Sequence, residues 1–281
     1  MLRDAREQGV IRFQLTYPAS RDSHWERSLR ERHRHHGLRD VVVVTEPPAS
    51  PRLDPVELVG AAAAEWLLGH LGDGQRVSIA WGTSVRSTVN HVFTRHRYAV
   101  EVSRLGGYVD AFSARGDHEM VRDLAARLGG TYCYPNVPAV LDSVAEAKAL
   151  YADTTIAHQL RRASAADIAI VGVGAFGQGS NRLLLDRAGV GHGERDRARG
   201  LGVVGEVCGR FYDHDGRDVE LPVDQRIISV RTGALVAIPN TVVVAAGARK
   251  AAAVIGALRG RMVTTLVCDL PLARAIAALP A

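Results

Sequence analysis

Residues 167–180 read DIAIVGVGAFGQGS. An apolar run at 168–171 leads directly into a glycine-rich turn, which is typical of a buried strand of a parallel sheet. Gly172, Gly174 and Gly177 also match the G-x-G-x-x-G spacing of dinucleotide-binding turns. The stretch therefore predicts an α/β core, and it raises the question of which ligand these glycines serve.

Strand and helix patterns alternate on both sides of this stretch. Continuous apolar runs separated by amphipathic segments predict a parallel sheet covered by helices on both faces. The predicted strands are 76–81, 98–105, 167–173, 240–247 and 262–269. The predicted helices are 57–71, 85–93, 118–128, 144–166, 248–260 and 271–279.

One segment departs from this alternation. Residues 205–222 read GEVCGRFYDHDGRDVELP, and the DHDG turn between strand-like runs predicts a hairpin inserted into the α/β core. No internal repeat and no long linker interrupts the chain, so residues 1–281 are expected to form one domain.

Composition narrows the function classes. The chain has 281 residues, 47% of them hydrophobic, and no apolar run approaches the length of a membrane span. The cysteines Cys133, Cys208 and Cys268 lie far apart, which favours reduced thiols in a cytoplasmic protein. The net charge of +5 favours anionic partners only weakly. Of the 35 basic Lys and Arg residues only Lys148 and Lys250 are lysines, so each is worth testing for a specific role.

A basic segment near the start, HWERSLRERHRHHG at 24–37, allows two interpretations. It could contact nucleic acid, but Glu26 and Glu31 interrupt its charge, which favours a solvated helix packed through its apolar side. His33, His35 and His36 have no carboxylate or cysteine at metal-ligand spacing. We therefore expect no metal site.

Four turns that follow predicted strands combine glycine with a hydrogen-bond donor. Glycine lets a ligand approach the backbone, and amides at the next helix N-terminus can hold an anion. Ligands of open parallel sheets bind at the carboxyl ends of the strands, where all four turns should lie. The set predicts a small anionic ligand such as a sugar phosphate. The turns are WGTS at 81–84, RLGG at 104–107, GVGAFGQGSNR at 172–182 and AAGARK at 245–250.

The dinucleotide interpretation fails a second requirement. A Rossmann site needs an acidic residue at the end of the next strand, about 20 residues after the glycines. Asp186, Glu194 and Asp196 follow Gly177, but no apolar strand carries them. The glycine spacing is therefore accidental, and no dinucleotide or other cofactor is expected.

Several segments resemble the sugar-binding effector domain of the SorC family of bacterial transcriptional regulators, a group also associated with the DeoR name. VSIAWGTSV is similar to the family's phosphate turn, DIAIVGVG to its central strand and GVVGEVCGRFYDHDG to its inserted hairpin. The stretch from 238 to 277, IPNTVVVAAGARKAAAVIGALRGRMVTTLVCDLPLARAIA, is similar to its C-terminal signature. The resemblance covers nearly the whole chain.

The resemblance implies a three-layer, Rossmann-like fold similar to ribose-5-phosphate isomerase and glucosamine-6-phosphate deaminase. It also implies binding of a phosphorylated sugar or related metabolite without turnover. Phosphate would be bound by the turn at 82–84, and Lys250 would contact the ligand from the last turn. The ligand-binding residues that the resemblance implies are Gly82, Thr83, Ser84, Arg104, Gly174, Gly247, Lys250 and Asp269.

The alternative on the same fold is a sugar-phosphate isomerase or deaminase, which would need a general base. Asp110, Asp117 and Asp269 are the candidate bases, and Lys250 could form a Schiff base. The related deaminases carry Asp-Gly-His where this chain has GAFGQGSN, which favours a sensor without catalytic residues.

The resemblance also implies partners. Family members bind DNA through an N-terminal helix-turn-helix, and we expect no such motif in residues 1–281. They usually form homodimers or homotetramers through the effector domain, and no membrane partner is expected.

Overall fold

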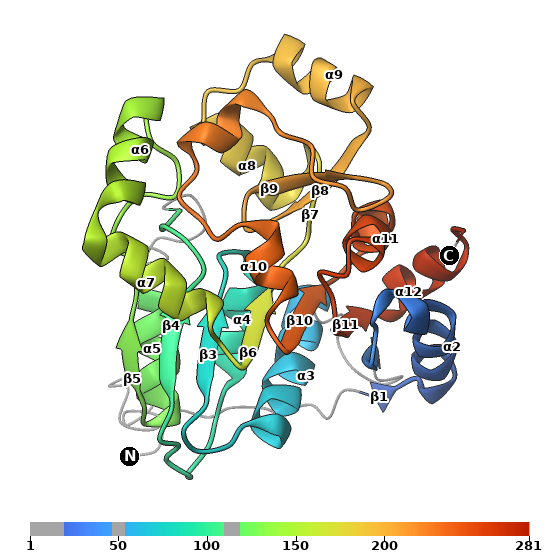
Figure 1. The fold of residues 1–281 in the computed structure, drawn as a ribbon. Coiled ribbons are helices and arrows are strands. Elements are labelled where there is room, and N and C mark those ends of the chain that lie inside the picture. The colour runs from blue at the N-terminus through green and yellow to red at the C-terminus, as the bar shows by residue number, and fades with distance from the viewer. Residues whose placement is uncertain (1–19, 47–53, 110–118, 281) are drawn as a thin grey trace, which may run out of the picture.

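The computed structural model describes residues 20–46, 54–109 and 119–280 (Figure 1). Its main sheet has eight strands in the order β1-β2-β11-β10-β6-β3-β4-β5. Neighbouring strands are parallel except β1, which pairs antiparallel with β2. The strands are β1 (Ser20–Arg21), β2 (Asp40–Thr45), β3 (Arg76–Ile79), β4 (Glu101–Arg104), β5 (Thr131–Cys133), β6 (Ile168–Val171), β10 (Asn240–Ala245) and β11 (Thr265–Asp269).

Helices cover both faces of this sheet, as the alternating sequence pattern predicts (Figure 1). One face is covered by α3 (Pro55–His70), α4 (Thr83–His91) and α5 (Glu119–Leu128). The other face is covered by α2 (Ser23–His33), α7 (Thr154–Ser164), α11 (Ala251–Arg259) and α12 (Leu270–Ala277). The remaining helical segments are η1 (Arg34–His36), α6 (Val144–Ala152), α8 (Gly179–Arg187), α9 (His192–Gly200), η3 (Pro222–Arg226), α10 (Thr232–Val236) and η4 (Ala248–Lys250).

The two faces of the sheet bury separate cores. In β10, Val243 packs into the cluster on the α11 face, whereas Val242 and Val244 pack into the cluster on the α3 face. Successive side chains of a strand point to opposite faces, so a strand covered on both sides needs apolar residues throughout. This is why the central strands have continuous apolar sequences.

The predicted long helix at 144–166 is two helices. Asp153 ends α6 and caps α7, because its extended backbone (ψ 126°) breaks the helix. Its carboxylate accepts hydrogen bonds from the amides of Thr155 and Ile156 at 2.8 and 2.9 Å. A single N-capping residue therefore accounts for the break.

The inserted hairpin is present, but its first turn differs from the predicted one. β8 (Val203–Val207) and β9 (Arg210–Asp213) pair antiparallel, with β7 (Gly174–Ala175) at the edge of this second sheet. The connection is Cys208–Gly209, with φ of 53° and 71°, as a two-residue hairpin requires. The DHDG turn lies at the far end of β9, where a bridge joins Tyr212 to Asp218.

Three adjacent strands fix the position of the site. β10, β6 and β3 are neighbours and parallel, so the turns that follow them meet at one edge of the sheet.

Among the helices of the described chain, none is long and apolar enough to cross a membrane.

Candidate functional site

The turns after β3, β6 and β10 line one cavity, together with the second sheet. We call it the strand-end pocket. It encloses about 20 Å³, enough for one water-sized group, so a larger ligand would have to widen it or extend outward. The lining residues are Trp81, Gly82, Thr83, Ser84, Gly172, Val173, Gly174, Ser180, Glu206, Cys208 and Lys250.

The turn after β3 supplies backbone amides. Gly82 has φ of +127°, a conformation that side chains disfavour, and it is the N-cap of α4. No side chain caps this helix, so the amides of its first turn are available to an anion. Thr83 and the buried Ser84 add hydroxyl groups at the same end.

The turn after β10 supplies a cation. Gly247, at φ +95°, precedes η4, which ends at Lys250. Burial lowers the pKa of Lys250, while Glu206 and Asp269 oppose that shift. Lys250 is thus a partly buried ammonium that faces the same pocket as the α4 amides.

Asp269 does not line the pocket but holds the neighbouring turn. Its carboxylate accepts from the Gly247 amide at 3.0 and 3.1 Å and from the Leu272 amide at 3.1 Å. The second bond caps α12, and the first fixes the turn that carries Lys250. Asp269 therefore positions the site from behind.

Glu206 was not anticipated from the sequence, yet it lies in the pocket with only 5% of its surface exposed. Burial raises its pKa from the usual 4.5 to about 7, against a hydrogen bond from the Gly209 amide and the charge of Lys250. One signal was available: an acidic residue within the apolar run VVGEV. Buried carboxyl groups with raised pKa values concentrate at functional sites.

Gly174 is where the second sheet meets the turn after β6. A Cβ atom there would lie 2.3 Å from Oε1 of Glu206 and 3.0 Å from Cβ of Asn181. No side chain fits this space, so glycine lets Glu206 and helix α8 approach the central strand. Gly174 thus lines the pocket, and its contact with a ligand stays a prediction.

Arg104 lies apart from the residues that the structure brings together. It ends β4, with Ile79 of β3 as its register partner, and it is 1% exposed. Its guanidinium lies 4.9 Å from the centre of the Tyr134 ring, and it does not line the strand-end pocket. The candidate bases Asp110 and Asp117 fall outside the described residues.

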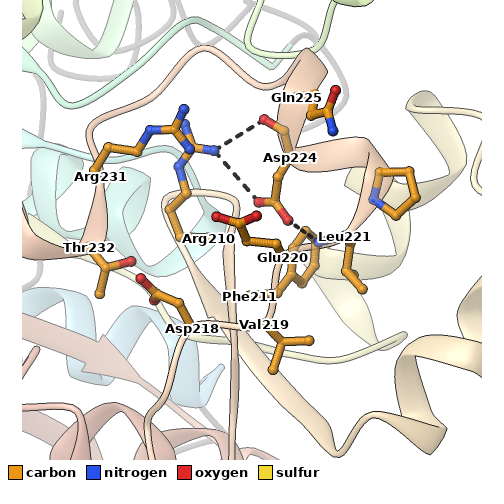
Figure 2. Close-up of a pocket in the computed structure, with 11 residues that line it drawn as sticks. Arg210, Phe211, Asp218, Val219, Glu220, Leu221, Asp224, Gln225, Arg231 and Thr232 are labelled. Carbon is orange, nitrogen blue, oxygen red and sulfur yellow. Dashed lines mark hydrogen bonds and ion pairs between the residues drawn. The ribbon is translucent and has the colours of Figure 1, made fainter.

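A second, larger cavity of about 570 Å³ lies beside the hairpin (Figure 2). It contains more charged side chains, including Arg210, Asp224 and Arg231. Burial raises the pKa of Asp224 to about 6, although its carboxylate lies 3.6 Å from Arg210 and accepts from the Leu221 amide at 2.7 Å.

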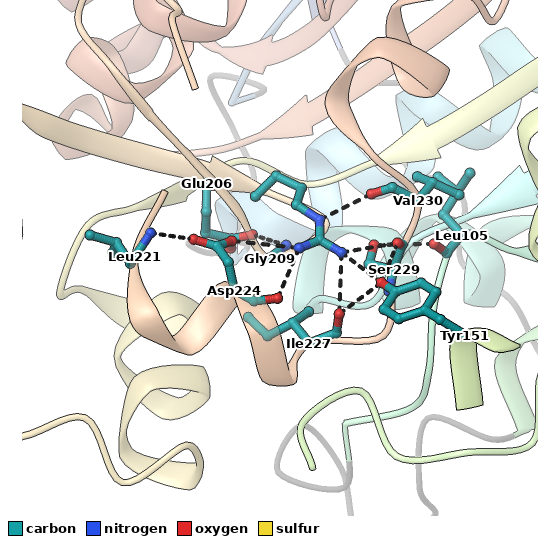
Figure 3. A network of polar contacts seen from close by, with 10 residues as sticks. Leu105, Tyr151, Glu206, Gly209, Leu221, Asp224, Ile227, Ser229 and Val230 are labelled. Atoms are coloured by element: carbon teal, nitrogen blue, oxygen red, sulfur yellow. Dashed lines mark hydrogen bonds and ion pairs between the residues drawn. The ribbon is translucent and has the colours of Figure 1, made fainter. Parts of the chain in front are cut away.

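The polar groups at the base of this larger cavity are used within the protein. Arg210 donates to the Tyr151 hydroxyl at 2.8 Å and to four backbone carbonyls between 3.0 and 3.2 Å (Figure 3). The carbonyls belong to Asp224, Ile227, Ser229 and Val230. These contacts make Arg210 a structural support of the 224–230 segment, so volume alone does not make this cavity the ligand site.

The potential metal ligands in the described chain lie elsewhere. Asp213, His214 and Asp215 bring ligand atoms within 4.8 Å of one another at the DHDG turn. Asp213 accepts from two amides of that turn, and Asp215 pairs with Arg217 at 2.7 Å. These groups stabilise the turn, and none lines the strand-end pocket.

The structure also excludes the dinucleotide arrangement. β6 is followed by the short strand β7, then by α8 and α9, and the next strand is β8 of the antiparallel sheet. A Rossmann unit would need a parallel strand at that point to carry an acidic residue to the ribose. The G-x-G-x-x-G spacing at 172–177 is therefore coincidental.

The chain is similar to several known proteins. Residues 17–278 match the family model described as "Putative sugar-binding domain". The LsrR transcriptional regulator of Klebsiella pneumoniae is 28% identical over 99% of this chain and 83% of its own length. The deoxyribonucleoside regulator of Bacillus subtilis is 26% identical over 98% of this chain and 86% of its length. These relatives are transcriptional regulators and not enzymes. They therefore favour the sensor over the isomerase or deaminase.

Solved structures show the same fold. A domain described as "Putative Sugar-Binding Domain of Transcriptional Repressor" from Vibrio fischeri superposes with a TM-score of 0.81 at 25% identity, covering 91% of this chain and 98% of that one. The full-length sorbitol operon regulator SorC of Klebsiella pneumoniae superposes with a TM-score of 0.80 at 23% identity, covering 98% and 87%. The inserted antiparallel sheet is thus part of a known architecture.

Proposed function

The chain belongs to the sugar-binding domain family of SorC/DeoR-type transcriptional regulators, and from this premise we propose that it senses a phosphorylated sugar in the strand-end pocket. The observation that supports this best is the convergence of the α4 N-terminus and Lys250 on one cavity. Helix amides and an ammonium group together favour an anion such as a phosphate group, for which the pocket would have to widen. The ligand-binding set is Gly82, Thr83, Ser84, Gly174, Glu206 and Lys250, with Gly247 and Asp269 holding the last turn.

We keep Arg104 as a proposed ligand contact, although it does not line the strand-end pocket. It lies one strand beyond β3 at the same carboxyl edge. A sugar phosphate larger than the enclosed 20 Å³ must extend beyond the wall, and Arg104 would then meet its far end.

A thermal-shift screen tests the proposal. The probes are glucose 6-phosphate, fructose 6-phosphate, ribose 5-phosphate, their unphosphorylated sugars and inorganic phosphate. A phosphosugar at 100 times its Kd should stabilise the folded chain by about 2.7 kcal/mol, whereas its unphosphorylated sugar should not. A chain that no phosphorylated compound stabilises would contradict the proposal.

We propose further that this binding controls operator recognition by a DNA-binding module in the cytoplasm, and that the domain assembles as a homodimer or homotetramer. The likeness to whole regulators over more than four fifths of their length supports the first statement, and the second rests on the family resemblance alone. Light scattering with and without the stabilising phosphosugar tests the assembly. A monomer under both conditions would contradict it.

A further inference from the structure

Asn181 holds a buried amide group that the fold itself does not fully use. The residue lies in the first turn of α8 and is 0% exposed. Its Oδ1 accepts a hydrogen bond of 2.7 Å from the Gly177 amide. Its Nδ2 has no hydrogen-bond partner within the part of the chain that the structure describes.

A buried donor without a partner lowers the stability of the folded state, so its presence needs a physical explanation. Leaving a buried polar group without a partner costs about 1–3 kcal/mol, and most buried side-chain polar atoms are paired. The Gly177 bond fixes which end of the amide is oxygen and directs Nδ2 away from that turn. The bond to Gly177 accounts for the amide oxygen, whereas Nδ2 has no such role in the described fold and is free to contact a ligand.

Asn181 lies against the strand-end pocket. Its Cβ is 3.0 Å from the place where a Gly174 side chain would begin, and Oε1 of Glu206 is 2.3 Å from the same point. Gly174, Glu206 and the preceding α8 residue Ser180 all line the pocket. The residue that carries the unpartnered donor and a buried carboxyl group therefore flank one glycine, on the α8 side of the cavity.

We propose that Asn181 is a specificity-determining residue that reads a hydroxyl group of the phosphosugar, a step that rests on the function proposed above. A hydroxyl can accept from Nδ2 of Asn181 and donate to Oε1 of Glu206 at the same time. A second phosphate at this place would be repelled by the carboxylate of Glu206. A sugar that lacks the hydroxyl would leave both Nδ2 of Asn181 and Oε1 of Glu206 without a ligand partner. The geometry thus points to a singly phosphorylated, hydroxylated sugar.

The test is a cycle between protein and ligand changes, measured by titration calorimetry. The ligands are glucose 6-phosphate, fructose 6-phosphate, ribose 5-phosphate, the monodeoxy analogue of each, and inorganic phosphate. The proteins are the wild type, Asn181→Ala and Asn181→Asp, which keeps an acceptor for the Gly177 amide but removes the donor. The matched control is Asn240→Ala, at the amino end of β10.

For the phosphosugar that binds tightest, one deoxy analogue should bind the wild type about tenfold more weakly. Asn181→Ala and Asn181→Asp should bind the parent sugar about tenfold more weakly and no longer distinguish it from that analogue. Inorganic phosphate should bind all variants equally, and Asn240→Ala should behave as the wild type.

Two results would overturn the inference while leaving the proposed function intact. Either every deoxy analogue binds the wild type as tightly as its parent, or the Asn181 variants keep the full discrimination. The comparison of parent and deoxy sugars needs only the wild-type protein, so it tests the inference even if a variant fails to fold. A wild type that binds none of these phosphorylated compounds would instead refute the proposed function, and this inference with it.

Discussion

The backbone amide of Gly209 donates a hydrogen bond of 2.7 Å to the carboxylate of Glu206, across the turn that joins β8 to β9. The two residues after Val207, Cys208 and Gly209, have positive φ angles, and Arg210 begins the returning strand. One short turn thus connects the strand-end pocket, which contains Glu206, with the Arg210 network that supports the larger cavity.

Glu206→Gln should change how stability depends on pH. Because its pKa rises from 4.5 to about 7 on folding, Glu206 binds a proton more tightly in the folded state. The stabilisation of the folded state by this tighter proton binding is complete below pH 4.5, and it is lost as the pH rises from there through 7. Glutamine keeps an acceptor for Gly209 and cannot ionise. Urea unfolding should show a stability loss between pH 5 and pH 8 that is smaller by about 2 kcal/mol than in the wild type.

The control for that experiment is Glu65→Gln, at an exposed position of α3. It should reproduce the wild-type pH profile. If Glu206→Gln also does so, the carboxyl group of Glu206 titrates as it would in water and the account of its burial is wrong.

Gly82→Ala should weaken phosphosugar binding by more than about tenfold. The new Cβ would meet no atom within 4 Å, but the φ of +127° disfavours any side chain. The turn would relax and withdraw the α4 amides from the anion. Titration calorimetry measures the loss, and circular dichroism checks the fold. The matched variant Gly69→Ala, in the exposed part of α3, should bind as the wild type does.

Lys250→Ala should weaken phosphosugar binding by about tenfold or more, because it removes a charge-assisted hydrogen bond. Lys250→Arg should recover little, since a planar guanidinium does not replace a compact ammonium in a narrow pocket. The exposed neighbour Arg249→Ala serves as the control and should have little effect. Small, equal effects of all three substitutions would mean that the ligand lies elsewhere.

Arg210→Met should destabilise the fold by about 3–5 kcal/mol, the usual cost of breaking a buried ion pair. The variant removes the ion-pair partner of the Asp224 carboxylate and one hydrogen-bond donor from each of four backbone carbonyls. Urea unfolding measures the loss, and the double variant Arg210→Met/Asp224→Leu should recover part of it. Arg217→Met, at an exposed position, is the control. A loss no larger than that of the control would show that the network is dispensable.

The sequence alone determined the parts of the structure that depend on local pattern. The continuous apolar runs at 168–171 and 242–245 predict buried parallel strands, and both are found. The glycines at 82, 174 and 247 mark the turns that meet at the strand ends. These signals are local because a strand buried on both faces and a turn with positive φ restrict the residues at their own positions.

Only the tertiary structure decided which side chains face the pocket. Glu206 lines it and Asn181 lies beside it because β8 pairs with β7, directly after β6, where Gly174 leaves room for both. Asp269 supports the last turn because β11 lies next to β10. The hairpin turn formed at Cys208–Gly209, although the DHDG sequence has stronger turn residues. Contacts between segments distant in sequence depend on strand order and register, and no single stretch of the chain encodes these.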